Sequence, residues 1–124
     1  MKHALIVDDD PFFRDILTRL LTGRYEIAAE ANAESGLRRC AERTPDLLML
    51  DLCLPGLSAT DLLARLATDP AAAEVPVVAF SAGRVEAPLR RSLEKSGVRR
   101  VLDKLSPPAE FLAAAVGEAP PDGR

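Results

Sequence analysis

The sequence is poor in cysteine and contains no long apolar run. Its two cysteines, Cys40 and Cys53, lie far apart and do not form a CxxC pair, so reduced thiols are the expected state. No apolar stretch approaches the roughly 18 residues that a transmembrane helix requires. Met1-Lys2-His3 leads directly into an apolar segment and does not resemble a signal peptide. We therefore expect a cytoplasmic protein with no membrane contact.

The sequence also lacks an excess of basic residues. Lysine and arginine number 16 against 19 aspartate and glutamate residues, giving a net charge of -3 and an isoelectric point near 5.2. Binding along a nucleic-acid backbone requires a basic face, so we expect no direct DNA binding. A length of 124 residues suits one domain, predicted over residues 1–117. The Pro- and Gly-containing tail, residues 118–124, has nothing to bury and is expected to be disordered.

Five segments have the composition of β-strands, and helical patterns separate them. Residues 25–30 and 98–102 mix apolar and charged side chains, as is typical of strands at the edge of a sheet. The other three segments are almost entirely apolar, which indicates strands buried on both faces. These segments are residues 4–7, 46–51 and 75–80. Apolar residues at helical spacing and capping residues predict helices over about residues 11–21, 32–43, 58–66, 86–95 and 108–116.

This alternation predicts a doubly wound α/β fold, in which a parallel sheet is covered by helices on both faces. The three apolar strands belong in the middle of the sheet, and the two mixed strands belong at its edges. With right-handed crossovers, the strand order that satisfies this is 2-1-3-4-5. The first and third strands are then neighbours at the switch point, where sheets of this type open a crevice beyond their carboxyl ends.

Polar residues that follow the strands should meet in this crevice. Asp8 and Asp9 follow the first strand, Asp51 ends the third, Ser81 ends the fourth and Lys104 follows the fifth. Three carboxylates a few ångströms apart repel one another unless a cation intervenes, and oxygen ligands in an open site favour Mg²⁺. A carboxylate beside a metal ion, a lysine on its far side and a hydroxyl has the parts needed to hold a phosphoryl group, and it can act as the nucleophile.

In these residues the sequence resembles the receiver domain of two-component response regulators. The resemblance covers residues 3 to about 117 and depends on the order and spacing of four motifs. They are Val7-Asp8-Asp9-Asp10-Pro11, Asp51 followed by Leu54-Pro55, Ser81 after an apolar strand, and Lys104. The resemblance implies a flavodoxin-like fold of five βα units in three layers. It also implies a stand-alone switch in a phosphorelay, although a receiver cut from a longer regulator remains an alternative.

The resemblance also implies roles for single residues. Asp51 would be the phosphoacceptor, and Asp8 and Asp9 would join it in binding Mg²⁺, with the backbone carbonyl of Cys53 as a further ligand. Ser81 would be the hydroxyl that moves onto the phosphoryl group. Lys104 would form the salt bridge with that group.

Three positions depart from the usual family pattern. Leu105 stands where proline in a cis peptide is usual, so we expect the Lys104–Leu105 peptide to be trans with a re-routed loop. Ala59 stands where glycine is usual, and Val101 replaces an aromatic switch residue, so the readout of Ser81 movement should differ from the usual one. These departures leave a constitutive pseudo-receiver as an alternative function. A Mg²⁺-dependent phosphatase is a second alternative, although Cys53 stands where such enzymes need another acid.

The implied partners are a sensor histidine kinase or histidine phosphotransfer protein, which would supply the phosphoryl group, and an unknown downstream protein. The segment Arg84–Arg100 is rich in basic residues. A solvated helix face is the simplest interpretation. Because receivers use this surface for contacts, we also predict an acidic partner or a homodimer there. The domain would catalyse its own phosphorylation and dephosphorylation and would not be an enzyme with a separate substrate.

Overall fold

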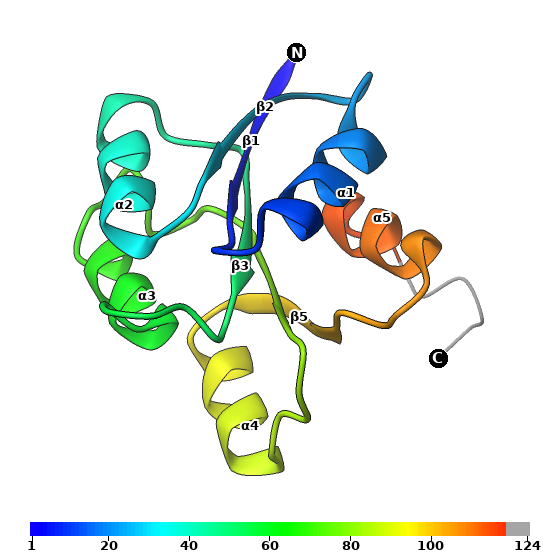
Figure 1. Ribbon diagram of the computed structural model, residues 1–124. Helices are drawn as coiled ribbons and strands as arrows, with labels where there is room; N and C mark the ends of the chain where they lie inside the picture. The colour runs from blue at the N-terminus through cyan, green and yellow to red at the C-terminus, as the bar shows by residue number, and fades with distance from the viewer. Residues whose placement is uncertain (119–124) are drawn as a thin grey trace.

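The computed structural model describes residues 1–118, which form five β-strands and five α-helices in alternation (Figure 1). The strands are β1 (Lys2–Val7), β2 (Tyr25–Glu30), β3 (Leu47–Asp51), β4 (Val77–Ser81) and β5 (Val98–Asp103). The helices are α1 (Pro11–Leu21), α2 (Ala33–Glu42), α3 (Ala59–Ala67), α4 (Ala87–Lys95) and α5 (Pro108–Val116). Most of the tail predicted to be disordered, residues 119–124, lies outside the described part of the chain.

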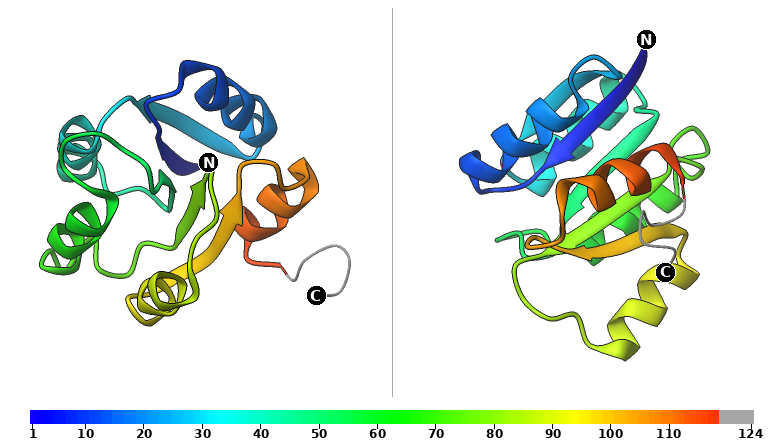
Figure 2. Two further views of the ribbon diagram at one scale, coloured as in Figure 1. Left: turned by 60° about the horizontal axis from the view of Figure 1, so that its bottom comes forward. Right: turned by 90° about the vertical axis from the view of Figure 1, so that its right-hand side faces the viewer.

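All neighbouring strands pair in parallel, in the order β2-β1-β3-β4-β5. The predicted fold and strand order are therefore confirmed. Helices α1 and α5 cover one face of the sheet, and α2, α3 and α4 cover the other (Figures 1 and 2). Over residues 1–118 no helix combines the length and apolar character needed to cross a membrane.

The central strands are largely apolar because each of them faces two cores. In β3, Leu48 and Leu50 pack in the core beneath α2, α3 and α4, whereas Leu47 and Met49 pack in the core beneath α1 and α5. All four side chains are at most 1% exposed. Side chains that alternate between two buried faces produce the continuous apolar run seen in the sequence.

The helices begin at the capping residues that the sequence indicates. The Asp10 carboxylate accepts the Phe12 N–H at 2.9 Å, and Asn32 and Ser58 cap α2 and α3 in the same way. The observed boundary of β4 differs slightly from the prediction, because the strand begins at Val77. Pro76, which precedes it, has no N–H to donate to the ladder.

Helix α2 lies unusually close to β1 just before the acidic residues. A Cβ atom at Gly36 would lie 2.9 Å from Val7 Cγ2, closer than packed side chains tolerate. Val7 is fully buried and is followed by Asp8. Glycine at this position lets the helix pack directly against the end of β1, where the strand leads into the candidate site.

Candidate functional site

Asp8 is held firmly at the carboxyl end of β1. Its N–H donates to Glu30 O at 3.1 Å, its carbonyl accepts from Arg14 Nη1 at 2.7 Å, and its Oδ1 accepts the Asp10 N–H at 2.9 Å. The side chain is fully buried. Its other oxygen, Oδ2, lies 2.9 Å from Lys104 Nζ. Asp9 is exposed beside it.

Asp51 lies at the end of the neighbouring strand β3 and is only 2% exposed. Its Oδ1 accepts the Cys53 N–H at 2.9 Å, and its Oδ2 lies 3.5 Å from Lys104 Nζ. The N–H of the following residue, Leu52, donates a hydrogen bond to Phe80 O at 2.8 Å. The carboxylate is thus oriented from one side by its own loop and faces a lysine on the other.

The three predicted acids form one cluster. Carboxylate oxygens of Asp8, Asp9 and Asp51 all lie within 4.8 Å of one another. Strands β1 and β3 are adjacent in the sheet, and this adjacency brings together residues that are more than forty positions apart. Oxygen donors at this spacing suit a hard divalent cation such as Mg²⁺. Asp8 Oδ2 is buried, and apart from its ion pair with Lys104 Nζ at 2.9 Å it makes no hydrogen bond within the described chain.

Lys104 lies between the two buried acids. The Lys104 N–H donates to Ser81 O at 2.9 Å, which fixes its backbone against β4. Its Nζ contacts Asp8 as well as Asp51. The ammonium also lies 4.7 Å from the centre of the Phe13 ring. Burial lowers the pKa of Lys104, but the ion pairs with both acids outweigh this and raise the pKa above its ordinary value.

Ser81 ends β4 and is 4% exposed. Its Oγ accepts the Gly83 N–H at 3.2 Å and lies 3.2 Å from Cys53 Sγ. Cys53 therefore links the loop that follows Asp51 to the hydroxyl at the end of β4.

Comparison with known proteins shows the family of the chain. Residues 4–116 match the family described as the response regulator receiver domain. The chain belongs to this family.

Two curated relatives and one solved structure illustrate the similarity of this receiver domain to others. A protein-glutamate methylesterase/protein-glutamine glutaminase of Bacillus licheniformis is 36% identical over 65% of this chain and 23% of its own length. The DNA-binding response regulator MtrA of Mycolicibacterium smegmatis is 34% identical over 90% of this chain and 48% of its own length. The receiver domain of NtrX from Brucella abortus superposes with a TM-score of 0.81 at 26% identity, covering 92% of this chain and 95% of that one. The receiver domain thus spans between about a quarter and a half of these two curated relatives.

The three departures from the usual receiver pattern are accommodated locally. No cis peptide occurs within residues 1–118, so the Lys104–Leu105 bond is trans as predicted, and the Leu105 N–H donates to Asp103 Oδ1 at 2.7 Å. Ala59 opens α3 without positive φ. Val101 is 6% exposed and packs in the core beneath α2, α3 and α4.

Sequence reasoning missed three contacts of the receiver site. The Phe13, Phe80 and Phe111 rings pack together beneath Lys104, with ring centres 5.3 to 5.9 Å apart. Arg14 holds the Asp8 carbonyl, and the Cys53 thiol contacts Ser81. A signal for the aromatic contact was present, because Phe80 immediately precedes Ser81. The other two depend on side-chain conformation, which spacing does not reveal.

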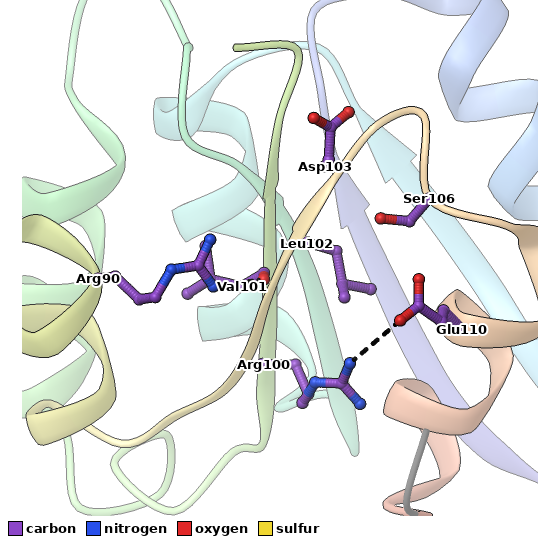
Figure 3. Close-up of a pocket in the computed structure, with 7 residues that line it drawn as sticks. All are labelled: Arg90, Arg100, Val101, Leu102, Asp103, Ser106 and Glu110. Carbon is purple, nitrogen blue, oxygen red and sulfur yellow. Dashed lines mark hydrogen bonds and ion pairs between the residues drawn. The ribbon is translucent and has the colours of Figure 1, made fainter. Parts of the chain in front are cut away.

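The basic segment of the receiver is not one uniform solvated face. Arg90 Nη1 donates to Val101 O at 2.9 Å, and Arg100 Nη2 lies 3.8 Å from a Glu110 carboxylate oxygen. These side chains line a cavity of about 520 Å³ between α4, β5 and α5 (Figure 3). Arg99 donates to two carbonyls at the end of α5. The exposed basic side chains of the segment are Arg84, Arg91, Lys95 and Arg99, and the predicted contact with an acidic partner would depend on them.

The stability of the metal-free receiver should depend on the protonation of Asp8. Desolvation raises the pKa of Asp8, the Asp10 N–H lowers it, and the Asp51 carboxylate raises it. A raised pKa means that the folded state binds the proton more readily than the unfolded state, so this contribution to stability is full below the ordinary value of 3.8 and is lost as pH rises through the raised value. In EDTA, lowering the pH toward the raised pKa should therefore stabilise the wild type relative to Asp8→Asn.

The measurement is the free energy of unfolding in urea across this pH range. Glu30 gives the opposite trend, because its hydrogen bond with Arg39 lowers its pKa, but this contribution is common to both proteins and cancels in the difference. Saturating Mg²⁺ should abolish the difference between wild type and Asp8→Asn in how the free energy of unfolding varies with pH, since Asp8 then remains ionised. Parallel pH profiles of the two metal-free proteins would contradict the prediction.

Proposed function

We propose that this receiver domain accepts a phosphoryl group on Asp51 and acts as a phosphorylation-dependent switch in a two-component system or phosphorelay. The supporting observation is the single cluster of three carboxylates with Lys104 ion-paired to two of them. The Asp51 carboxylate is buried but lies at the carboxyl end of the central strand β3. A charged, oriented oxygen at such a position can act as a nucleophile toward phosphorus.

Asp8, Asp9 and Asp51, with the backbone carbonyl of Cys53, would hold Mg²⁺. The bound ion supplies positive charge that neutralises the phosphoryl oxygens during transfer. Lys104 Nζ, already between Asp8 and Asp51, contributes a second positive charge on the side of β5. The Ser81 hydroxyl would turn toward the phosphoryl group once it is on Asp51 and donate a hydrogen bond to it.

The phosphodonor would be the phosphohistidine of a sensor kinase or of a phosphotransfer protein. A carboxylate oxygen of Asp51 forms a bond to phosphorus as the bond from phosphorus to the donor imidazole breaks, and the imidazole leaves with the electron pair. The added charge on Asp51 would shift the domain between two conformations, and the signal would leave by protein contact in the cytoplasm.

The domain would accelerate its own phosphorylation and the later hydrolysis of its aspartyl phosphate. It would not act as an enzyme on a separate substrate. Phosphatases that use an aspartyl nucleophile need a second acid at the position of Cys53, and the thiol cannot supply a carboxylate proton. A constitutive pseudo-receiver is disfavoured by the intact acidic cluster.

The test is titration of the protein with beryllofluoride, a mimic of the phosphoryl group, in the presence and absence of Mg²⁺. NMR amide shifts should report saturation at one equivalent, dependent on both Mg²⁺ and Asp51. An assay of phosphomonoester turnover should give no activity. Failure of beryllofluoride to bind would favour the constitutive module, and turnover would favour the phosphatase.

The phosphodonor should contact an apolar groove that shares Lys104 with the site. The groove has a volume of about 270 Å³ and lies between α1 and the loop that joins β5 to α5. Its lining includes Ile16, which is 39% exposed, and Leu105, which is 90% exposed. A protein donor that brings its phosphohistidine to Asp51 would lie against this groove, and apolar side chains at the centre of a contact contribute strongly to binding.

We expect Leu105→Asp to slow phosphotransfer from a histidine kinase by about tenfold, since loss of one apolar contact of this kind costs about 1.4 kcal/mol. The rate with a small phosphodonor such as phosphoramidate should remain within about twofold, because that donor does not use the groove. The measurement is the phosphorylation rate with each donor. Leu89→Asp on α4, where the side chain is 42% exposed, is the matched control and should leave both rates unchanged. Equal slowing with both donors would show that Leu105 acts on the site and does not bind the kinase.

A further inference from the structure

The Cys53 side chain contacts the switch hydroxyl in a way that the proposed phosphorylation does not use. Its Sγ lies 3.2 Å from Ser81 Oγ, and the Ser81 side chain is otherwise held by the Gly83 N–H at 3.2 Å. Cys53 is itself fixed, because its N–H donates to Asp51 Oδ1 at 2.9 Å. One residue therefore touches the phosphoacceptor through its backbone and the switch hydroxyl through its side chain.

We propose that Cys53 is a positioning residue that holds the Ser81 hydroxyl away from Asp51 until the phosphoryl group is present. This inference rests on the proposed function, in which Ser81 donates to that group. Within the metal-free site the hydroxyl is shared between the Cys53 thiol and the Gly83 N–H. To reach a phosphoryl oxygen it must leave the thiol.

The chemistry of sulfur makes this contact weak enough to exchange. A thiol is a poor donor and a poor acceptor, whereas a bond from a hydroxyl to a phosphoryl oxygen is charge-assisted and about twice as strong as a neutral one. Phosphorylation therefore replaces the Cys53 contact and gains free energy. Before phosphorylation, the same contact holds Ser81, which is 4% exposed, in one orientation without the cost of an unpaired buried hydroxyl.

The test is the affinity of the protein for beryllofluoride in saturating Mg²⁺. Cys53→Ala keeps the backbone N–H and carbonyl of residue 53 but removes the thiol. Its dissociation constant for beryllofluoride should fall about two- to fivefold, which corresponds to the loss of one weak hydrogen bond from the unliganded state. Cys53→Ser restores a hydrogen-bonding partner and should return the constant to the wild-type value or above it.

The matched control is Cys53→Ala in a protein that already lacks the Ser81 hydroxyl. In a Ser81→Ala background, Cys53→Ala should leave the dissociation constant unchanged, because the contact that it removes is already absent. A change of equal size in that background would overturn the inference, since a general effect of the side chain on the loop does not require Ser81. An unchanged constant for Cys53→Ala in the presence of Ser81 would also overturn it. In both cases binding by the wild type would leave the proposed function standing, whereas a wild type that does not bind would remove that function first.

Discussion

Replacing Asp51 with asparagine is expected to abolish phosphorylation by any donor. The substitution keeps the size of the side chain and its acceptor for the Cys53 N–H, but it removes the carboxylate that attacks phosphorus. The rate should fall on the order of 10³-fold or more, as it does when a nucleophile is removed. The measurement is incorporation of label from phosphoramidate or from a phosphorylated kinase, with binding of beryllofluoride as a second readout.

The same variant should fold at least as well as the wild type without metal. Asp51 and Asp8 are both buried and share Lys104, so neutralising one acid relieves repulsion, and the free energy of unfolding should rise by about 1 kcal/mol in EDTA. A variant that loses phosphorylation while gaining stability excludes misfolding as the cause.

Asp10→Asn is the matched control for Asp51→Asn. It replaces an adjacent acid of the same sequence motif, but Asp10 caps α1 and lies outside the carboxylate cluster. Asparagine caps helices as well as aspartate does, so stability and the phosphorylation rate should both stay near the wild-type values. Phosphorylation retained by Asp51→Asn would assign the phosphoacceptor to another residue.

Replacing Lys104 with methionine should have the largest effect on stability. Methionine keeps much of the apolar stem over the Phe13 ring but removes the charge that faces Asp8 and Asp51. Two buried carboxylates would then face each other without a cation. Removing one partner of a buried pair usually costs about 3–5 kcal/mol, and uptake of a proton by Asp8 limits the loss, so we expect the free energy of unfolding to fall by about 2–3 kcal/mol in EDTA.

The measurement is urea unfolding at pH 7, with and without Mg²⁺. The ion should restore part of the lost stability, because it neutralises the same carboxylates. Lys95→Met, at the exposed end of α4, is the control and should change the unfolding free energy by less than about 0.5 kcal/mol. A Lys104→Met protein as stable as the wild type without metal would mean that solvent screens the two acids.

Much of the site was predictable because it lies at strand ends. The sequence pattern separates buried strands from edge strands, and in this fold that distinction determines which strands are neighbours. Asp8 and Asp51 could be placed together on this basis alone, before any contact was known. The N-caps Asp10 and Asn32 were predictable for a similar reason, since capping depends on residues only two or three positions away.

The sequence places Lys104 at the site but does not show how its ammonium is shared between the two buried acids. Strand order places its Cα at the right edge, but a lysine side chain has four rotatable bonds and can extend in several directions. In the structure the ammonium lies over the rings of Phe13 and Phe80 and contacts both acids. The partners of Arg90 and Arg100 were missed for the same reason, since these long side chains turn back onto β5 and α5.

The amino-acid sequence alone determined the order of the strands and which acids meet. The apolar content of a strand indicates whether it is buried on both faces, and a parallel sheet brings the carboxyl ends of all its strands to one edge. Only the tertiary structure decided how the polar side chains share their partners. Lys104 pairs with Asp8 as well as Asp51, and the Cys53 thiol engages Ser81, because these choices depend on rotamers set by packing between segments distant in the chain.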